Sequence, residues 1–294
     1  MTSENKVVEK DPKVRRIDYT ELCSFVLCKR KWYARHFLSI VPKAARPPLD
    51  FGIALHEALD VMYQTKFDLE AVLEKWHSLK FEADMKRTSM VGELMLKSYH
   101  TQYCEQNMEA LHHEVIWELP FDHFNLCGRM DRVVQWHDGL WIMDHKTSSR
   151  MGATYFEQFN PHMQVSMYLH AGRQYFGDDV RGFIADALFV GKTNKNQRDV
   201  VTIGEEELSQ RMDEVLHHSY ELVDTETSLK EKPAMWRTTC PRAMITETCS
   251  AWGCCEYRDL CRYGYKPKFI EAQFRKEVWT PAGGDPDGKV GQDV

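Results

Sequence analysis

The stretch that decides the fold is DRVVQWHDGLWIMDHKTS, residues 131–148, which predicts a β-hairpin. Two runs of β-branched and aromatic residues flank the dipeptide Asp138-Gly139. An Asp-Gly pair between two such runs is a strong signal for a two-residue turn. With these two residues as the loop, His137 pairs with Leu140.

The predicted register gathers charge on one face at one end of the hairpin. Counting back from the turn, Val133 lies opposite Asp144 and Asp131 lies opposite Lys146. Side chains alternate between the two faces of a strand, and directly opposite residues share a face. Asp131, Asp144 and Lys146 therefore project from the same face. Apolar residues fill the middle of the hairpin, namely Val133, Leu140 and Ile142 on this face and Val134, Trp136, Trp141 and Met143 on the other.

This charged end has the chemistry of a metal site. Two neighbouring carboxylates suit a hard divalent cation such as Mg²⁺ or Mn²⁺, which keeps several waters. A lysine beside them can orient a metal-bound water or offset negative charge in a transition state. The alternative is a simple salt bridge between Asp131 and Lys146 at a sheet edge, because D-x-K occurs often by chance.

Hydrophobic periodicity predicts an α/β chain around the hairpin. Helical spacing predicts helices over 19–37, with Thr20 or Asp18 as N-cap, and over 51–64, 68–110 (one or two), 162–175 and 205–229. Strands are predicted over 113–121, 127–137 and 140–147, and two more within 181–203 across a turn at 192–196. The expected organisation is a flexible arm at 1–15, a helical part at 16–110, an α/β core at 111–235, a Cys-rich segment at 236–279 that packs on the N-terminal helix, and a disordered tail at 280–294.

Composition excludes several classes. Hydrophobic residues make up 43% of the 294 residues, enough for a substantial core. No apolar run approaches a membrane span, and the polar start MTSENKVVEK is unlike a secretory signal, so we expect a cytoplasmic protein without membrane contact. The sequence at Gly191-Lys192-Thr193 is not a phosphate-binding loop, because Asp186 stands where that motif needs glycine.

Three further residues are candidates for the same site because of their order along the chain. Gln164 and Tyr168 are four residues apart and share one face of the helix that follows the hairpin. His56 lies on a helix well before it. Taken alone, Tyr168 is equally a core aromatic, and His56 is more often a solvated histidine.

In this order, G-x-x-x-H-E at residue 52, G-R-M-D-R at 128, D-H-K-T at 144 and Q-x-x-x-Y at 164 resemble the PD-(D/E)xK nucleases. They resemble in particular the RecB-type exonuclease branch, over roughly residues 20 to 265. The resemblance implies a restriction-endonuclease-like core with a central mixed sheet flanked by helices. It also implies roles for the residues that match the motifs. His56, Asp131, Asp144 and the carbonyl of His145 would bind Mg²⁺ or Mn²⁺, Lys146 would activate water, and Gln164 and Tyr168 would position the lysine or the DNA.

Nine cysteines are many for a cytosolic chain, in which disulfides are disfavoured. No C-x-x-C pair occurs, which counts against a zinc knuckle. Cys249, Cys255 and Cys261 are evenly spaced, and either Cys254 or Cys240 offers a local fourth ligand. A subset of RecB-type nucleases, phage and CRISPR-associated, carries an iron–sulfur cluster. Resemblance to that subset implies a 4Fe–4S cluster on Cys28, Cys249, Cys255 and Cys261, with Cys254 an open alternative to Cys255, and with Cys23, Cys104 and Cys127 as buried thiols.

The resemblance implies an exonuclease that acts on DNA ends, with single-stranded DNA favoured. Recombination or repair, phage DNA metabolism and CRISPR adaptation are roles that fit, with a helicase or adaptation protein as partner. Four residues of the first helix are candidate DNA contacts: Arg30, Lys31, Trp32 and Arg35. The alternative for them is a solvated helix face with Trp32 in the core. Two alternative functions are a catalytically silent DNA-binding scaffold and a zinc-binding adaptor.

Overall fold

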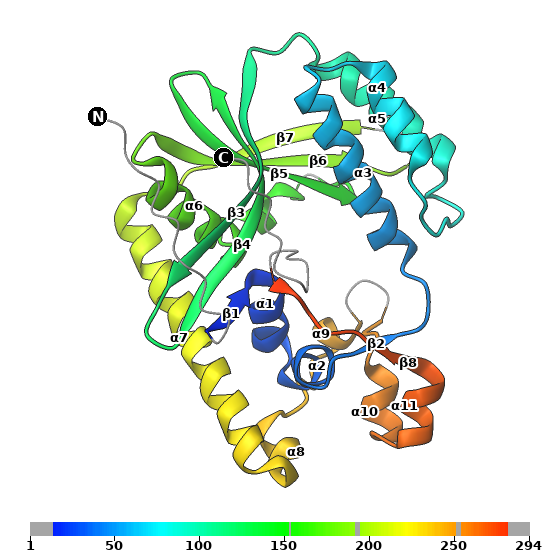
Figure 1. The fold of residues 1–294 in the computed structure, drawn as a ribbon, viewed down its shortest axis with the longest axis vertical. Coiled ribbons are helices and arrows are strands. Elements are labelled where there is room, and N and C mark those ends of the chain that lie inside the picture. The colour runs from blue at the N-terminus through cyan, green and yellow to red at the C-terminus, as the bar shows by residue number, and fades with distance from the viewer. Residues whose placement is uncertain (1–13, 153, 192–194, 251–253, 282–294) are drawn as a thin grey trace.

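A mixed β-sheet forms the centre of the computed structural model, which describes residues 14–152, 154–191, 195–250 and 254–281 (Figure 1). The strands of this sheet are β1 (Arg15–Asp18), β3 (Met108–Pro120), β4 (Phe124–Trp136), β5 (Gly139–Ser148), β6 (Val180–Phe189) and β7 (Lys195–Val201). Their order is β1-β4-β5-β6-β7, and β3 pairs with the other side of β4. The β1–β4 and β5–β6 pairs are parallel and the others are antiparallel. The predicted α/β class with a central mixed sheet is confirmed.

Helices cover both faces of the sheet, as the alternation of apolar residues along the strands requires. One face packs under α3 (Pro47–Gln64), α4 (Leu69–Ser78) and α5 (Ser89–Tyr103). The other packs against α1 (Tyr19–Leu27), α6 (Met163–Phe176) and α7 (Glu205–Glu231). Val134 and Met143 enter the first core, and Val133 and Ile142 enter the second, so the predicted division of the hairpin between two faces is confirmed.

A third, smaller cluster joins the two ends of the described chain. After α1 come α2 (Lys29–Trp32), a π-helical turn (Tyr33–Phe37) and β2 (Ile40–Pro42), and β2 pairs with β8 (Phe274–Lys276). The segment before β8 contains α8 (Trp236–Thr239), α9 (Thr246–Ser250), α10 (Arg258–Tyr263) and α11 (Pro267–Gln273), and the remaining short turns are Phe156–Phe159 and Pro233–Met235. Ala34, Ile40, Tyr257, Leu260 and Phe274 form the core of this cluster. The end of the described chain therefore packs on its N-terminal helices.

The hairpin turn lies one residue earlier than predicted. Trp136 pairs with Gly139, so His137 and Asp138 form the loop, and His137 has a φ of 53°. Gly139 serves the strand instead, because a Cβ there would lie 2.3 Å from the side chain of Arg181 on β6. The pairing partners shift by two residues, which leaves every side chain on its predicted face.

The single helix predicted over 19–37 is broken. Asp18 is the N-cap, with its carboxylate accepting from the Glu21 N–H at 2.8 Å, but the helix stops at Cys28, whose backbone is extended. The predicted arm at 1–15 extends one residue too far, since β1 begins at Arg15. Most of that arm, most of the predicted tail and turn residues 192–194 lie outside the described residues. Within those described, no helix is both long and apolar enough to cross a bilayer.

Packing of Trp117 of β3 against Gly128 of β4 gives a test of the fold near the motif G-R-M-D-R. A Cβ on Gly128 would lie 2.6 Å from the Trp117 indole, and Trp117 is 1% exposed. We expect Gly128→Ala to lower the free energy of unfolding by about 1–3 kcal/mol, because a rigid ring must move. Urea denaturation measures the change. Gly152→Ala, outside the helices and strands and with no atom within 4 Å of the added Cβ, is the control and should change stability by less than about 0.5 kcal/mol. Equal losses in both variants would contradict this account.

Candidate active site

The candidate site lies where β4 and β5 separate. The two strands pair from the turn as far as Arg132 and Met143. Beyond that point β5 continues along β6, and the first residues of β4 pair with β1 instead. Asp131 and Asp144 are the next residues on each strand after the last pair. The backbone N–H of His145 donates to Oδ2 of Asp131 at 2.8 Å, so a carboxylate accepts a bond that a strand carbonyl would otherwise take.

His56 reaches the site from α3. Its Nδ1 lies 3.3 Å from Oδ2 of Asp131, and its side chain is 31% exposed. Asp131 and Asp144 are almost completely buried, with 8% and 2% of their surface exposed. One imidazole and two carboxylates from three different elements therefore converge, as the motif order predicted.

Lys146 and Gln164 complete the other side. The ammonium of Lys146 is in close contact with Oδ2 of Asp144, and it donates to Oε1 of Gln164 at 3.1 Å. The Gln164 amide donates to the Tyr168 hydroxyl at 3.0 Å, and Tyr168 donates to the carbonyl of Arg129. The alternative Asp131–Lys146 salt bridge is not formed, because the shifted register puts Asp144, and not Lys146, opposite Asp131.

The site holds its two carboxylates in different electrostatic states. Burial raises the pKa of Asp131, but the charge and hydrogen bond of His56 lower it by a larger amount, so the pKa lies below its usual value. For Asp144, burial and the charge of Asp131 raise the pKa more than Lys146 lowers it. Burial lowers the pKa of His56, yet Asp131 and Asp144 raise it above its usual value. Two close buried carboxylates repel each other, and a cation relieves that repulsion.

The donor set fits a hard divalent cation. Oδ2 of Asp144 is buried and receives no well-directed hydrogen bond, although the Lys146 ammonium lies against it. Carboxylate oxygens, one imidazole and a backbone carbonyl are suitable ligands for Mg²⁺ or Mn²⁺. His56, Asp131, Asp144 and the His145 carbonyl are the groups available.

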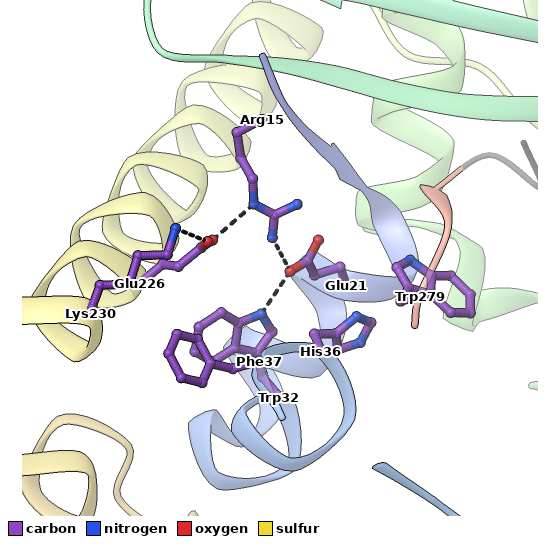
Figure 2. A pocket seen from close by; sticks show the side chains of 8 residues that line it. All are labelled: Arg15, Glu21, Trp32, His36, Phe37, Glu226, Lys230 and Trp279. Atoms are coloured by element: carbon purple, nitrogen blue, oxygen red, sulfur yellow. Dashed lines mark hydrogen bonds and ion pairs between the residues drawn. The ribbon is translucent and has the colours of Figure 1, made fainter. Parts of the chain in front are cut away.

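The predicted DNA contacts on the first helix point largely inward. Trp32 is 1% exposed and donates from Nε1 to Glu21 at 3.0 Å, beside the Arg15–Glu226 pair that lines a cavity of about 430 Å³ (Figure 2). Arg30 donates to the carbonyl of Cys240 at 2.6 Å. Arg35 contacts Glu277, and the more exposed Lys31 contacts Glu256. These contacts disfavour binding of DNA by Arg30, Trp32 and Arg35. Of the alternative, Trp32 does lie in the core, but Arg30 and Arg35 are buried and not on a solvated helix face.

Cys28, Cys255 and Cys261 lie within electrostatic reach of one another at the junction of the chain ends. Cys28 sits in the break between α1 and α2, and its charge contributes to raising the pKa of Cys255 and Cys261, after burial as the main cause. The N–H of Cys255 donates to the carbonyl of Cys249 at 2.9 Å. Cys240 is also within electrostatic reach of Cys28, and its pKa is raised to about 11, chiefly by burial.

The other thiols differ. Cys254 is exposed. Cys127 is buried in β4, as expected for an apolar thiol, and burial raises its pKa to about 12. Cys23 is only partly buried, and Cys104 is exposed, because it follows the last residue of α5 at a surface turn. The prediction that Cys104 is a buried thiol was therefore wrong.

Sequence analysis missed a row of buried polar side chains behind the site. Arg132, Asp186 and the ring of His145 lie on the face opposite the side chains of Asp131 and Asp144 and are at most 1% exposed, and the His145 ring centroid lies 5.8 Å from that of His56. Charged residues inside the apolar runs RVV and IADALF were the available signal. Tyr19 was also missed: its hydroxyl lies 3.3 Å from Nε2 of His162 at the start of α6.

The His56–Asp131 pair predicts a titration. In metal-free protein we expect the pKa of His56 to lie above its usual value, and Asp131→Asn to lower it, because of the two carboxylates that oppose the effect of burial only Asp144 then remains. The stabilisation tied to His56 is full below pH 6.5 and is lost as pH rises through the raised pKa. NMR of the imidazole measures both values. Asp199→Asn on exposed β7 is the control, and an unchanged His56 titration in Asp131→Asn would contradict the pairing.

Comparisons with known proteins find similar structures and one sequence family. A candidate exonuclease from Eubacterium rectale is similar in structure, with a TM-score of 0.47 and 12% identity over 90% of this chain and 94% of that one. The structure of SSO0001 gives a TM-score of 0.31 and 13% identity over 71% of this chain and 79% of that one. No curated protein sequence matches. A sequence model described as the PD-(D/E)XK nuclease superfamily matches residues 16–262, and the chain belongs to that superfamily.

Proposed function

We propose that this nuclease is a metal-dependent exodeoxyribonuclease that hydrolyses phosphodiester bonds from DNA ends, with single-stranded DNA preferred. The observation that carries the proposal is the convergence of His56, Asp131, Asp144, Lys146 and Gln164 where β4 and β5 part. The fold family supplies the nuclease chemistry, and the resemblance to RecB-type exonucleases supplies the preference for ends.

In this proposal His56, Asp131, Asp144 and the His145 carbonyl would hold one or two Mg²⁺ or Mn²⁺ ions. A bound divalent cation lowers the pKa of water and offsets charge on the phosphate. Lys146, held by Gln164 at 3.1 Å, orients the attacking water and balances negative charge as it develops. Water oxygen forms the new bond to phosphorus, the bond from phosphorus to the leaving oxygen breaks, and that oxygen takes up a proton.

We further propose that the thiols at the chain ends bind a 4Fe–4S cluster through Cys28, Cys249, Cys255 and Cys261. Support comes from the shared neighbourhood of Cys28 with Cys255 and Cys261. Burial raises the pKa of Cys261, and the charges of Arg30 and Arg242 oppose that rise. Nearby cations favour the anionic cluster that four thiolates form. Such a cluster would close a loop of more than two hundred residues and would act as a structural staple.

The nuclease proposal is tested on end-labelled linear single-stranded DNA with Mn²⁺ or Mg²⁺. We expect Asp144→Ala and Lys146→Met each to lower kcat/KM at least about a hundredfold, because each removes charge that acts on the transition state. Asp199→Ala, an exposed carboxylate on β7, is the control and should cut like the wild type. DNA binding without cutting under either metal would instead establish the scaffold function. Cutting of closed circles as fast as linear DNA would contradict action on ends.

The cluster proposal is tested by anaerobic purification of serine variants. We expect brown wild-type protein with about four iron atoms per chain, and loss of colour, iron and thermal stability in Cys28→Ser and Cys261→Ser. Cys254→Ser is the matched control, since Cys254 is adjacent to a proposed ligand but exposed, and it should keep its colour. Colourless wild-type protein that contains zinc would contradict the cluster proposal and favour the zinc-adaptor function.

A further inference from the structure

A polar row crosses the sheet directly behind the candidate site, on the face covered by α3 and α5. His145 of β5 is in register with Asp186 of β6, and Asp186 is in register with Arg198 of β7. Arg132 of β4 extends the row on the other side of His145. Four successive strands therefore each contribute one polar side chain to the same buried line.

The members of this row are joined by direct contacts. Nη1 of Arg132 donates to Nε2 of His145, which places the imidazole proton on Nδ1, and Nδ1 lies 2.8 Å from Oδ2 of Asp186. That last contact is close, although its angle is not that of a well-directed hydrogen bond. Arg198 donates from Nε to Oδ1 of Asp186 at 3.0 Å, and the Tyr99 hydroxyl donates to Oδ2.

The row is anchored at its Arg132 end and sealed from solvent. Arg132 lies 3.3 Å from Asp60 on α3, and its guanidinium stacks 4.1 Å above the ring of Tyr63. Asp186 is completely buried, and His145 is 1% exposed. Removing one partner from such a buried, charge-balanced network leaves the others unsatisfied, so the arrangement resists rotation of any single side chain.

The row links β4 and β5 at the point where the two strands separate. Arg132 directly follows Asp131, and His145 directly follows Asp144. The backbone ladder stops at Arg132 and Met143, so beyond that pair the strands are linked by side chains. Two links are the Arg132–His145 contact and the bond from the His145 N–H to the Asp131 carboxylate. The separation of the two site carboxylates therefore depends on where His145 is fixed.

We propose that Asp186 is a positioning residue: through His145 it sets the separation of Asp131 and Asp144, and so the affinity of the site for Mg²⁺ or Mn²⁺. The inference rests on the proposed function, in which these carboxylates hold the cation. Asp186 itself lies behind the sheet and touches neither cation nor DNA. Residues that orient metal ligands typically change metal affinity or activity about 10- to 100-fold when mutated.

The test is a Mn²⁺ titration of DNA-free protein, followed by the EPR signal of unbound Mn²⁺. The EPR signal falls as Mn²⁺ binds. The part of this fall that the wild type shows and Asp144→Ala does not is assigned to binding at the candidate site. Asp186→Asn keeps the side chain's size but turns an amide toward the donors Arg198 and Tyr99, so we expect Mn²⁺ to bind about 10-fold more weakly. Tyr99→Phe, which removes one donor to Asp186, is a milder second variant and should weaken binding in the same direction.

Glu21→Gln is the matched control for loss of a buried carboxylate. Glu21 is 1% exposed and pairs with Arg15 and Trp32, away from the site. We expect it to lower Tm as Asp186→Asn does, while Mn²⁺ affinity stays within about twofold. Wild-type Mn²⁺ affinity in folded Asp186→Asn and Tyr99→Phe would overturn this inference alone, provided that the wild type cuts DNA. Wild-type protein that neither binds Mn²⁺ at Asp144 nor cuts DNA would overturn both this inference and the proposed function.

Discussion

The separation of β4 from β5 is the constraint on which the rest of the structure depends. A sheet that opens leaves backbone groups without ladder partners, and each buried group left unpaired costs about 1–3 kcal/mol. Here side chains take those bonds: Asp131 accepts from the His145 N–H, and Tyr168 donates to the Arg129 carbonyl. The residues that the sequence marks as functional are therefore also those that make the open sheet stable.

Opening the sheet places two carboxylates in an almost dry position, and that arrangement is costly without compensation. Burying a charge is tolerated when it is paired and hydrogen-bonded. His56 pairs with the charge of Asp131, and Lys146 pairs with the charge of Asp144. Both buried carboxylates are therefore paired only when α3, β4 and β5 are all in place. Gln164 then fixes Lys146 from α6. Because each partner comes from a different element, the site cannot form before the tertiary fold does.

The parts of this arrangement that could be predicted from sequence are those set by periodicity. The faces of the hairpin were predictable because a register error of two residues leaves each side chain on its face. The partner of Lys146 was not predictable, because it depends on the register of the hairpin. That register depends on whether Gly139 lies in the turn or in the strand, where it packs against Arg181. The row behind the site was missed because Asp186 and Arg198 acquire meaning only through their register with His145. For CKRKWYARH, residues 28–36, no local pattern says that Arg30 and Trp32 turn inward, because their partners Cys240 and Glu21 are set by packing.

The junction of the chain ends is linked to the site by a continuous line of contacts. Trp279, beyond β8, donates to the Asp18 carboxylate at 3.0 Å, and the same carboxylate caps α1. Tyr19, the next residue, touches His162 at the start of α6, the helix that carries Gln164. The segment that bears three of the proposed cluster cysteines therefore helps to fix the helix that positions Lys146. The proposed cluster at this junction would therefore stabilise the candidate site, and this structural role requires no electron transfer.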